Sequence, residues 1–259
     1  MIIIPAIHIT FSLEKPLTVP VNYQHLLQAF VYKILPQKEA TFLHEHGFQH
    51  QNRTYKLFVF SSLQSSNITY DKETKKLTFY DKLYLSISSI IPDIVEKTAN
   101  FLLLSEDLEM NGVSLKVESL EFDKLEVQDN EIVVRALSPI TVYSTFERRD
   151  GSKITHFFSP FDKVFEHLLE ENFIRKYEAF YNKPFAEEGQ VLSVEPIQVD
   201  SRDKVVTNYK STWITGWKGM YRLKAKPEYL SFLLNTGLGS KNSIGFGMIR
   251  PESTLPKRD

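Results

Sequence analysis

The chain has 259 residues, a formal net charge of −1, 42% hydrophobic residues and no cysteine. This length accommodates one large or two small domains with a sizeable core, and the lack of cysteine excludes disulfides and thiolate metal sites, as is typical of the reducing cytoplasm. No apolar run approaches the roughly 20 residues of a membrane-spanning helix, and the N-terminus lacks the basic region of a secretory signal peptide. We therefore expect a soluble, cytoplasmic protein that does not bind membranes.

Positive charge is concentrated near the C-terminus. Residues 201–250 contain nine lysine and arginine side chains against two acidic ones, a net charge of +7, which leaves −8 for the rest of the chain. A basic face of this kind favours a polyanion such as nucleic acid as the partner. A solvated, lysine-rich hairpin would have the same composition.

The first half of the chain alternates strands and helices. An apolar stripe with helical spacing predicts a helix that begins after Pro20 and Asn22 and ends at Pro36; the stripe consists of Tyr23, Leu26, Leu27, Phe30, Val31 and Ile34. A short helix follows from Lys38 to His46, before Gly47. Strands are predicted at 2–11, 55–63, 68–80 (folded back at 71–73), 82–90, 108–110 and 113–120, and a helix at 92–103.

The second half repeats this order. Residues 131–146 are rich in strand formers, and Ser159 as N-cap with Pro160 at the first helical position predicts a helix that continues to Asn182. Strands are predicted at 191–199, 207–223 and 245–249, and a short helix at 227–234. The sequence thus predicts an α+β fold of two tandem ferredoxin-like (RRM-like) βαββαβ domains, spanning 1–126 and 131–250.

A glycine-rich segment at 237–247 holds four of the ten glycines. Glycine permits positive φ and close approach of the backbone, and successive free N–H groups form an anion-binding concavity. Lys241, Asn242 and Ser243 lie at its centre, which suits a phosphate. The alternative is a loop that joins two elements and binds nothing. Neither the P-loop spacing nor the dinucleotide-binding spacing is present.

Histidines cluster near the end of the predicted short helix, at His44, His46 and His50, with Glu45 beside them. The H-E-x-x-H spacing of zinc-binding helices is absent, so acid–base chemistry is favoured, because histidine both accepts and donates a proton near neutral pH. Tyr32 lies off the apolar stripe of its helix. The alternative is that Tyr32 is a tyrosine at the edge of the core and His44 a surface histidine.

Four segments resemble the CRISPR repeat-processing endoribonucleases of the repeat-associated mysterious protein superfamily. Residues 19–32 (VPVNYQHLLQAFVY) are similar to the first helix of that family, and 40–45 (ATFLHE) to its histidine segment. Residues 137–140 (LSPI) resemble the start of its second domain, and 239–248 (GSKNSIGFGM) its glycine-rich loop. The segments occur in the family's order over nearly the whole chain.

The resemblance implies metal-independent cleavage of precursor CRISPR RNA without a cofactor, by attack of a 2′-hydroxyl that leaves a 2′,3′-cyclic phosphate and a 5′-hydroxyl. In this interpretation His44 matches the catalytic histidine and Tyr32 the tyrosine that assists it. The family's lysine is replaced in the loop 51–53, so Arg53 and Lys56 are both candidates for the cation that stabilises the developing charge.

Contacts with RNA are expected mainly from the C-terminal half. The residues predicted to bind RNA are Lys210, Lys218, Arg222, Gly239, Lys241, Asn242, Ser243 and Gly245. Tyr209, Trp213 and Trp217 are candidates for base stacking, with core packing expected for at least one tryptophan.

Two alternatives to this function stay open. The protein could be a non-cleaving RNA-binding subunit of the same fold or a metal-dependent nuclease that uses the histidine cluster. Association with other CRISPR-associated proteins, or with a second copy as a homodimer, is also open.

Overall fold

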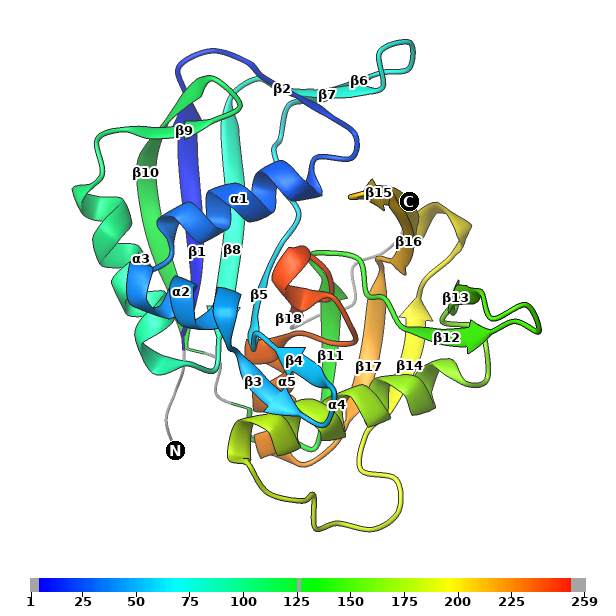
Figure 1. Ribbon diagram of the computed structural model, residues 1–259. Coiled ribbons are helices and arrows are strands. Elements are labelled where there is room, and N and C mark those ends of the chain that lie inside the picture. Colours follow the sequence, from blue (N-terminus) through cyan, green and yellow to red (C-terminus); the bar gives the residue numbers. More distant parts are fainter. Residues whose placement is uncertain (1–4, 125–126, 253–259) are drawn as a thin grey trace.

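The computed structural model describes residues 5–124 and 127–252. In the first half, an antiparallel sheet has the strand order β5-β8-β1-β10-β9 (Figure 1). Its strands are β1 (Pro5–Leu13), β5 (Phe58–Phe60), β8 (Lys82–Ser89), β9 (Leu108–Met110) and β10 (Val113–Lys124). Its helices are α1 (Gln24–Ile34), α2 (Gln37–Glu45) and α3 (Pro92–Leu104).

Strand β1 forms the centre of this sheet because alternate side chains point into the core. Ile7, Ile9 and Phe11 are almost fully buried, and β1 pairs antiparallel with both β8 and β10. The predicted stripe of α1 packs against the same core, where Phe30 meets Phe11 edge-on at a ring distance of 5.7 Å. Tyr23 lies in this core too, and its hydroxyl accepts a hydrogen bond from the Leu63 N–H at 3.1 Å.

The second half forms another antiparallel sheet, with the order β14-β17-β11-β18. Its elements are β11 (Glu131–Ala136), α4 (Phe165–Tyr181), β14 (Ser193–Gln198), β17 (Met220–Lys224), α5 (Pro227–Thr236) and β18 (Ile249–Pro251). Both sheets therefore have the strand order of a βαββαβ ferredoxin-like fold, with β9 added at one edge of the first. The predicted α+β architecture is confirmed.

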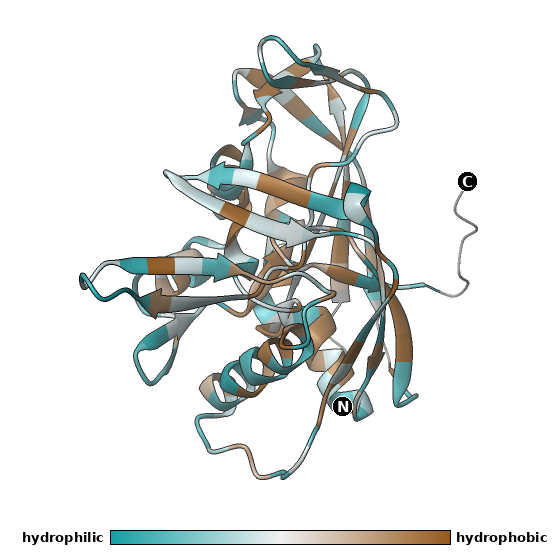
Figure 2. Ribbon diagram, turned by 90° about the vertical axis from the view of Figure 1, so that its right-hand side faces the viewer, coloured by the Kyte–Doolittle hydropathy of each residue, from teal (hydrophilic) through white to brown (hydrophobic). Residues whose placement is uncertain are grey.

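Shorter strand pairs project from the two sheets. One of these groups has three strands, β2 (Leu17–Pro20), β7 (Lys76–Phe79) and β6 (Ile68–Asp71). The others are hairpins, formed by β3 (Phe48–His50) with β4 (Arg53–Tyr55), β12 (Tyr143–Glu147) with β13 (Lys153–Phe157), and β15 (Lys204–Tyr209) with β16 (Thr212–Trp217). Strand β13 contacts β16. The β12–β13 and β15–β16 hairpins reach outward on the same side of the protein (Figures 1 and 2).

Buried hydrogen bonds join the two halves. Ser88 Oγ on β8 donates to Asn235 Oδ1 on α5 at 3.0 Å, and Ser138 Oγ donates to the Phe60 carbonyl oxygen at 3.1 Å. The β15–β16 hairpin also packs on the start of α1, where the Thr207 hydroxyl lies 3.0 Å from Gln24 Oε1. The glycine-rich segment itself contacts both halves, since the Ser243 carbonyl oxygen accepts from Gln28 and the Ser240 N–H donates to the Thr141 carbonyl oxygen.

Three local predictions differ from the structure. The helix predicted from Ser159 begins at Phe165, because residues 159–164 form a turn in which the Ser159 N–H bonds to Asp162 Oδ2 at 2.7 Å. The strand predicted at 207–223 spans most of β15, β16 and β17, since turns interrupt it. The strand predicted at 245–249 forms only from Ile249 onward.

The fold-back at 71–73 is close to the observed turn between β6 and β7. Residues 1–4 of the first predicted strand and position 126 of the predicted domain boundary lie outside the described residues. Within the described ranges, no helix is long and apolar enough to cross a membrane.

Candidate functional site

The glycine-rich segment forms a compact loop that folds back on itself after α5. Leu238 N–H donates to the Gly247 carbonyl oxygen at 2.8 Å, so the two ends of the loop are paired. Gly247 has φ +76°, and a Cβ there would lie 2.0 Å from the Leu238 carbonyl oxygen. A Cβ at Gly239 or Gly245 would likewise press on Thr141 or Phe60. Close packing inside the protein thus requires these glycines whether or not RNA approaches them.

Asn242 stabilises the loop from within. Its side-chain amide donates to the Phe246 carbonyl oxygen at 3.0 Å, and its Oδ1 accepts from Lys176 Nζ at 3.4 Å. Lys176 also donates to the Gly237 carbonyl oxygen at 2.5 Å. The Asn242 side chain, predicted to contact RNA, is therefore used for the shape of the loop.

Lys176 was not predicted from the sequence. It lies on α4, 2% exposed, on the face that also buries Leu169 and Phe173. Its position seven residues after Leu169 and three after Phe173 places it on the apolar stripe of the helix. A lysine on such a stripe is the signal that could have identified it.

A cavity of about 490 Å³ lies between the glycine-rich loop, α4, β12 and the segment that follows β4. Four of its lining residues are cations, namely Arg53, Lys56, Lys176 and Lys241, and none of the described lining residues is Asp or Glu. Burial lowers the pKa values of Lys56 and Lys241 and lowers that of Lys176 to about 7. The cavity is therefore electropositive and has no carboxylate in its lining to neutralise it.

Tyr32 and His44 lie beside this cavity on α1 and α2. Their rings are edge to face, with centroids 6.4 Å apart, and Tyr32 also packs on Phe58 at 5.6 Å. His44 is exposed in the last turn of α2. Burial, with a smaller contribution from Tyr209, raises the pKa of Tyr32 to about 12, so its hydroxyl stays protonated at neutral pH and can donate a hydrogen bond.

The two candidate cations differ in their contact with this pair. Lys56 Nζ donates to the His44 backbone carbonyl oxygen at 3.0 Å, which ties it to the histidine segment. Arg53 is exposed on β4 and lines the same cavity. The structure thus brings both to the site, and Lys56 is the one in direct contact with the histidine segment.

Gln28 on α1 connects the loop to the β15–β16 hairpin and was also not predicted. Its Nε2 donates to the Ser243 carbonyl oxygen at 3.0 Å, and its Oε1 accepts from the Tyr209 hydroxyl. Tyr209 is thereby held next to the loop. An amide on the polar side of a predicted helix carries no signal that distinguishes it from a solvated residue.

The remaining predicted RNA contacts lie away from the cavity lining. Lys210 is exposed at the tip of the β15–β16 hairpin, with its Nζ 5.6 Å from the Tyr209 ring centre. Burial lowers the pKa of Lys218. Trp213 is 63% exposed, whereas Trp217 is buried and packs edge-on against Phe161 at 5.8 Å.

Ion pairs neutralise much of the predicted basic face. Arg222 pairs with Glu131 at 3.0 Å and with Glu195 at 2.6 Å. Four other cations of residues 201–250 also form ion pairs with acidic residues that precede this segment in the chain. These cations are Arg202, Lys224, Lys226 and Arg250. Lys241 forms no ion pair within the described residues, and its Nζ lies 4.9 Å from the Tyr143 ring centre. Of the cations of this segment, Lys241 is therefore the one that brings unpaired charge to the lining of the cavity.

The histidine cluster is dispersed. His50 Nε2 lies 3.2 Å from Glu178, whereas His46 lies 3.9 Å from Glu45. Across the ranges 5–124 and 127–252, no group of three or more His, Asp or Glu side chains is placed to hold a metal ion.

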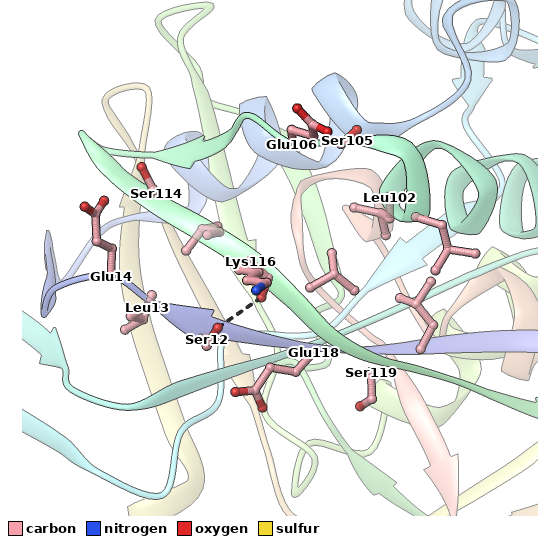
Figure 3. A pocket seen from close by; sticks show the side chains of 14 residues that line it. Ser12, Leu13, Glu14, Leu102, Ser105, Glu106, Ser114, Lys116, Glu118 and Ser119 are labelled. Carbon is pink, nitrogen blue, oxygen red and sulfur yellow. Dashed lines mark hydrogen bonds between the residues drawn. The ribbon is translucent and has the colours of Figure 1, made fainter.

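A larger cavity, of about 620 Å³, lies in the first half of the chain, between the end of α3 and strands β1 and β10 (Figure 3). Lys116 lines it together with Glu14, Glu106 and Glu118, over leucine side chains. Its lining, all of it within the described residues, includes none of the predicted site residues and is more acidic than basic. It is not suited to a phosphate backbone.

Comparisons with known proteins point to one family. Residues 18–121 match the family described as "CRISPR-associated protein Cas6, N-terminal", and residues 120–251 match "CRISPR associated protein Cas6, C-terminal". The chain is 30% identical to CRISPR-associated endoribonuclease Cas6 1 of Methanocaldococcus jannaschii, over 89% of this chain and 86% of the relative. It is 26% identical to CRISPR-associated endoribonuclease Cas6 of Pyrococcus furiosus, over 95% and 88%.

A solved structure shares the fold. The product of a Cas6-related gene from Pyrococcus furiosus superimposes with a TM-score of 0.80 at 20% identity, covering 97% of this chain and 99% of that one.

Proposed function

This chain belongs to the Cas6 family of CRISPR-associated proteins, and from that premise we propose that it is an endoribonuclease that cleaves precursor CRISPR RNA within its repeats. The observation that carries the proposal is the cavity lined by four cations and no carboxylate, beside Tyr32 and His44. An RNA phosphate supplies the negative charge that this cavity lacks. Residues 1–126 would provide the catalytic side chains, and residues 131–250 the loop that binds the phosphate.

The reaction we propose is an in-line transesterification that needs no metal ion. The 2′-oxygen upstream of the cut forms a bond to phosphorus while the bond to the 5′-oxygen breaks, giving a 2′,3′-cyclic phosphate and a 5′-hydroxyl. The 2′-hydroxyl must lose a proton and the leaving oxygen must gain one, and His44 performs one of these transfers. The protonated Tyr32 hydroxyl assists by donating a hydrogen bond.

Charge on the non-bridging oxygens grows during the attack and requires a fixed cation. Lys56 fits this role best, because its ammonium group is held by the His44 backbone and faces the same cavity. Lys241 and those loop N–H groups that do not already donate within the protein, as Ser240 and Gly245 do, would hold a neighbouring phosphate. Trp213 and Lys210, exposed on the β15–β16 hairpin, would contact the RNA beyond the cavity.

Single-turnover cleavage of a labelled CRISPR repeat RNA tests these roles. His44→Ala should slow cleavage about 10²–10⁴-fold, as loss of a general acid or base does, while RNA affinity changes little. Lys56→Met should slow cleavage about 10²-fold or more. Arg53→Met should reduce the cleavage rate by a smaller factor than Lys56→Met does.

Wild-type RNA binding without cleavage would instead assign an RNA-holding subunit. Equal losses for Lys56→Met and Arg53→Met would contradict the assignment of the cation.

A further inference from the structure

Lys176 is the most deeply buried charged group of the site. It is 2% exposed, and its ammonium group donates to the Gly237 carbonyl oxygen at 2.5 Å and to Asn242 Oδ1 at 3.4 Å. Within the described residues it has no carboxylate partner. These two bonds leave one of its three N–H donors unassigned.

An ammonium group in this position is unfavourable for stability alone. Burying a cation without a counter-charge is costly, and burial accordingly lowers the pKa of Lys176 to about 7. A methionine would fill the same volume without that cost. The lysine is therefore explained better by what the cavity binds than by packing.

The two acceptors of Lys176 lie at different points of the glycine-rich loop. Gly237 ends α5, with its N–H on the Leu233 carbonyl oxygen. Asn242 begins the short 3-10 turn of the loop and, through its other amide atom, holds the Phe246 carbonyl oxygen. One side chain on α4 thus joins the beginning, the middle and the end of the loop.

We propose that Lys176 is a positioning residue that fixes the glycine-rich loop in the conformation that binds an RNA phosphate, and that a bound phosphate in turn favours its charged form. This inference rests on the proposed function only in taking the phosphodiester backbone as the anion. Cleavage itself is assigned to other residues. If Lys176 has this role, phosphate binding is coupled to the order of the loop and to proton uptake at this buried lysine.

The groups that face Lys176 across the cavity are cations or tyrosines. Lys241 lies on the loop, Arg53, Tyr55 and Lys56 lie on and after β4, and Tyr143 lies on β12. On α4, the neighbouring Arg175 is paired with Glu171 at 2.7 Å. Burial also lowers the pKa values of Lys56 and Lys241, so the proton uptake that belongs to Lys176 is the difference between the wild type and Lys176→Met.

The test compares Lys176→Met with the wild type and with Lys183→Met, which removes an exposed lysine that lies over Tyr181. The ligand is a repeat RNA with a 2′-deoxy substitution at the cut, and calorimetry at pH 8 in two buffers of different ionisation enthalpy gives affinity and proton uptake. We expect Lys176→Met to bind about tenfold more weakly, with smaller proton uptake. Lys183→Met should match the wild type in proton uptake.

Lys176→Gln is the second variant, since an amide can still donate to Gly237 without carrying charge. It should fold and show the same reduced proton uptake. Wild-type affinity and proton uptake in both variants would overturn the proposal. If the wild-type protein binds this RNA but does not cut the unmodified one, the proposed function fails while the inference on Lys176 is still decided.

Discussion

RNA binding should weaken as the salt concentration rises, because it depends on a small number of phosphate contacts at the cavity. Lys241→Met should remove one of these contacts. Apart from the buried Lys176, three cations line the cavity, namely Arg53, Lys56 and Lys241. For single-stranded RNA the logarithm of affinity falls by about 0.7 per neutralised phosphate for each unit of log salt, so the three cavity contacts alone contribute a slope of about −2, to which a contact from Lys210 would add. Between about 50 and about 200 mM salt this corresponds to a roughly 20-fold loss.

Fluorescence anisotropy with a labelled repeat RNA, made uncleavable by a 2′-deoxy substitution, measures this slope. Lys241→Met should make it shallower by about 0.7. Arg222→Met is the matched control, because Arg222 is held by Glu131 and Glu195 and has little charge left for RNA. Its slope should equal that of the wild type. An unchanged slope for Lys241→Met, or an equal decrease for Arg222→Met, would show that the backbone does not run through the cavity.

Three further predictions concern stability. Tyr23→Phe should lower the free energy of unfolding by about 1–3 kcal/mol, because the buried Leu63 N–H loses its acceptor; an unchanged urea midpoint would contradict this. Gly247→Ala should lower the free energy of unfolding by more than about 2 kcal/mol and weaken RNA binding. Gly151→Ala, also at positive φ but with open space around it, should lower the free energy of unfolding by only about 1 kcal/mol. Equal losses of stability in the two variants would contradict the close packing at Gly247. From pH 7 to 9.5 the wild type should gain stability relative to Lys176→Met. The reason is that the unfolded chain keeps the lysine proton up to its ordinary pKa of 10.5, whereas the folded chain releases it near 7. Urea titrations of both proteins across this pH range measure whether the difference in unfolding free energy changes in this direction.

The order of the main elements could be predicted because periodicity is a local signal. The stripe from Tyr23 to Ile34 appears as a buried helix face, and the repeated order of strands and helices is observed in both sheets. Errors occurred where tertiary contacts decided the boundary. Ser159 has the chemistry of an N-cap, yet it is used in a turn with Asp162, and the helix begins five residues after Pro160.

The residues of the candidate site were predicted from the family resemblance together with the chemistry of the residue types. Tyr32 and His44 lie ring to ring, and Lys56 and Lys241 line one cavity. Lys176 could not be found by charge counting, because its role depends on burial and on two acceptors about 60 residues away along the chain.

The predicted basic face was overestimated for the converse reason. A net charge of +7 over a segment does not reveal acids such as Glu131 and Asp123, which reach that segment only in the folded protein. The roles of the site residues in binding and catalysis stay predictions.

The most direct test of metal-independent 2′-hydroxyl chemistry is cleavage of a labelled CRISPR repeat RNA in the presence of EDTA. Wild-type protein, His44→Ala and wild-type protein with an RNA carrying one 2′-deoxy substitution upstream of the cut are compared in parallel. We predict that the wild type cuts in EDTA and leaves a cyclic phosphate, that the 2′-deoxy substitution abolishes cutting, and that His44→Ala slows it about 10²–10⁴-fold. Cleavage that requires a divalent cation, or that proceeds on the 2′-deoxy RNA, would contradict the proposed mechanism.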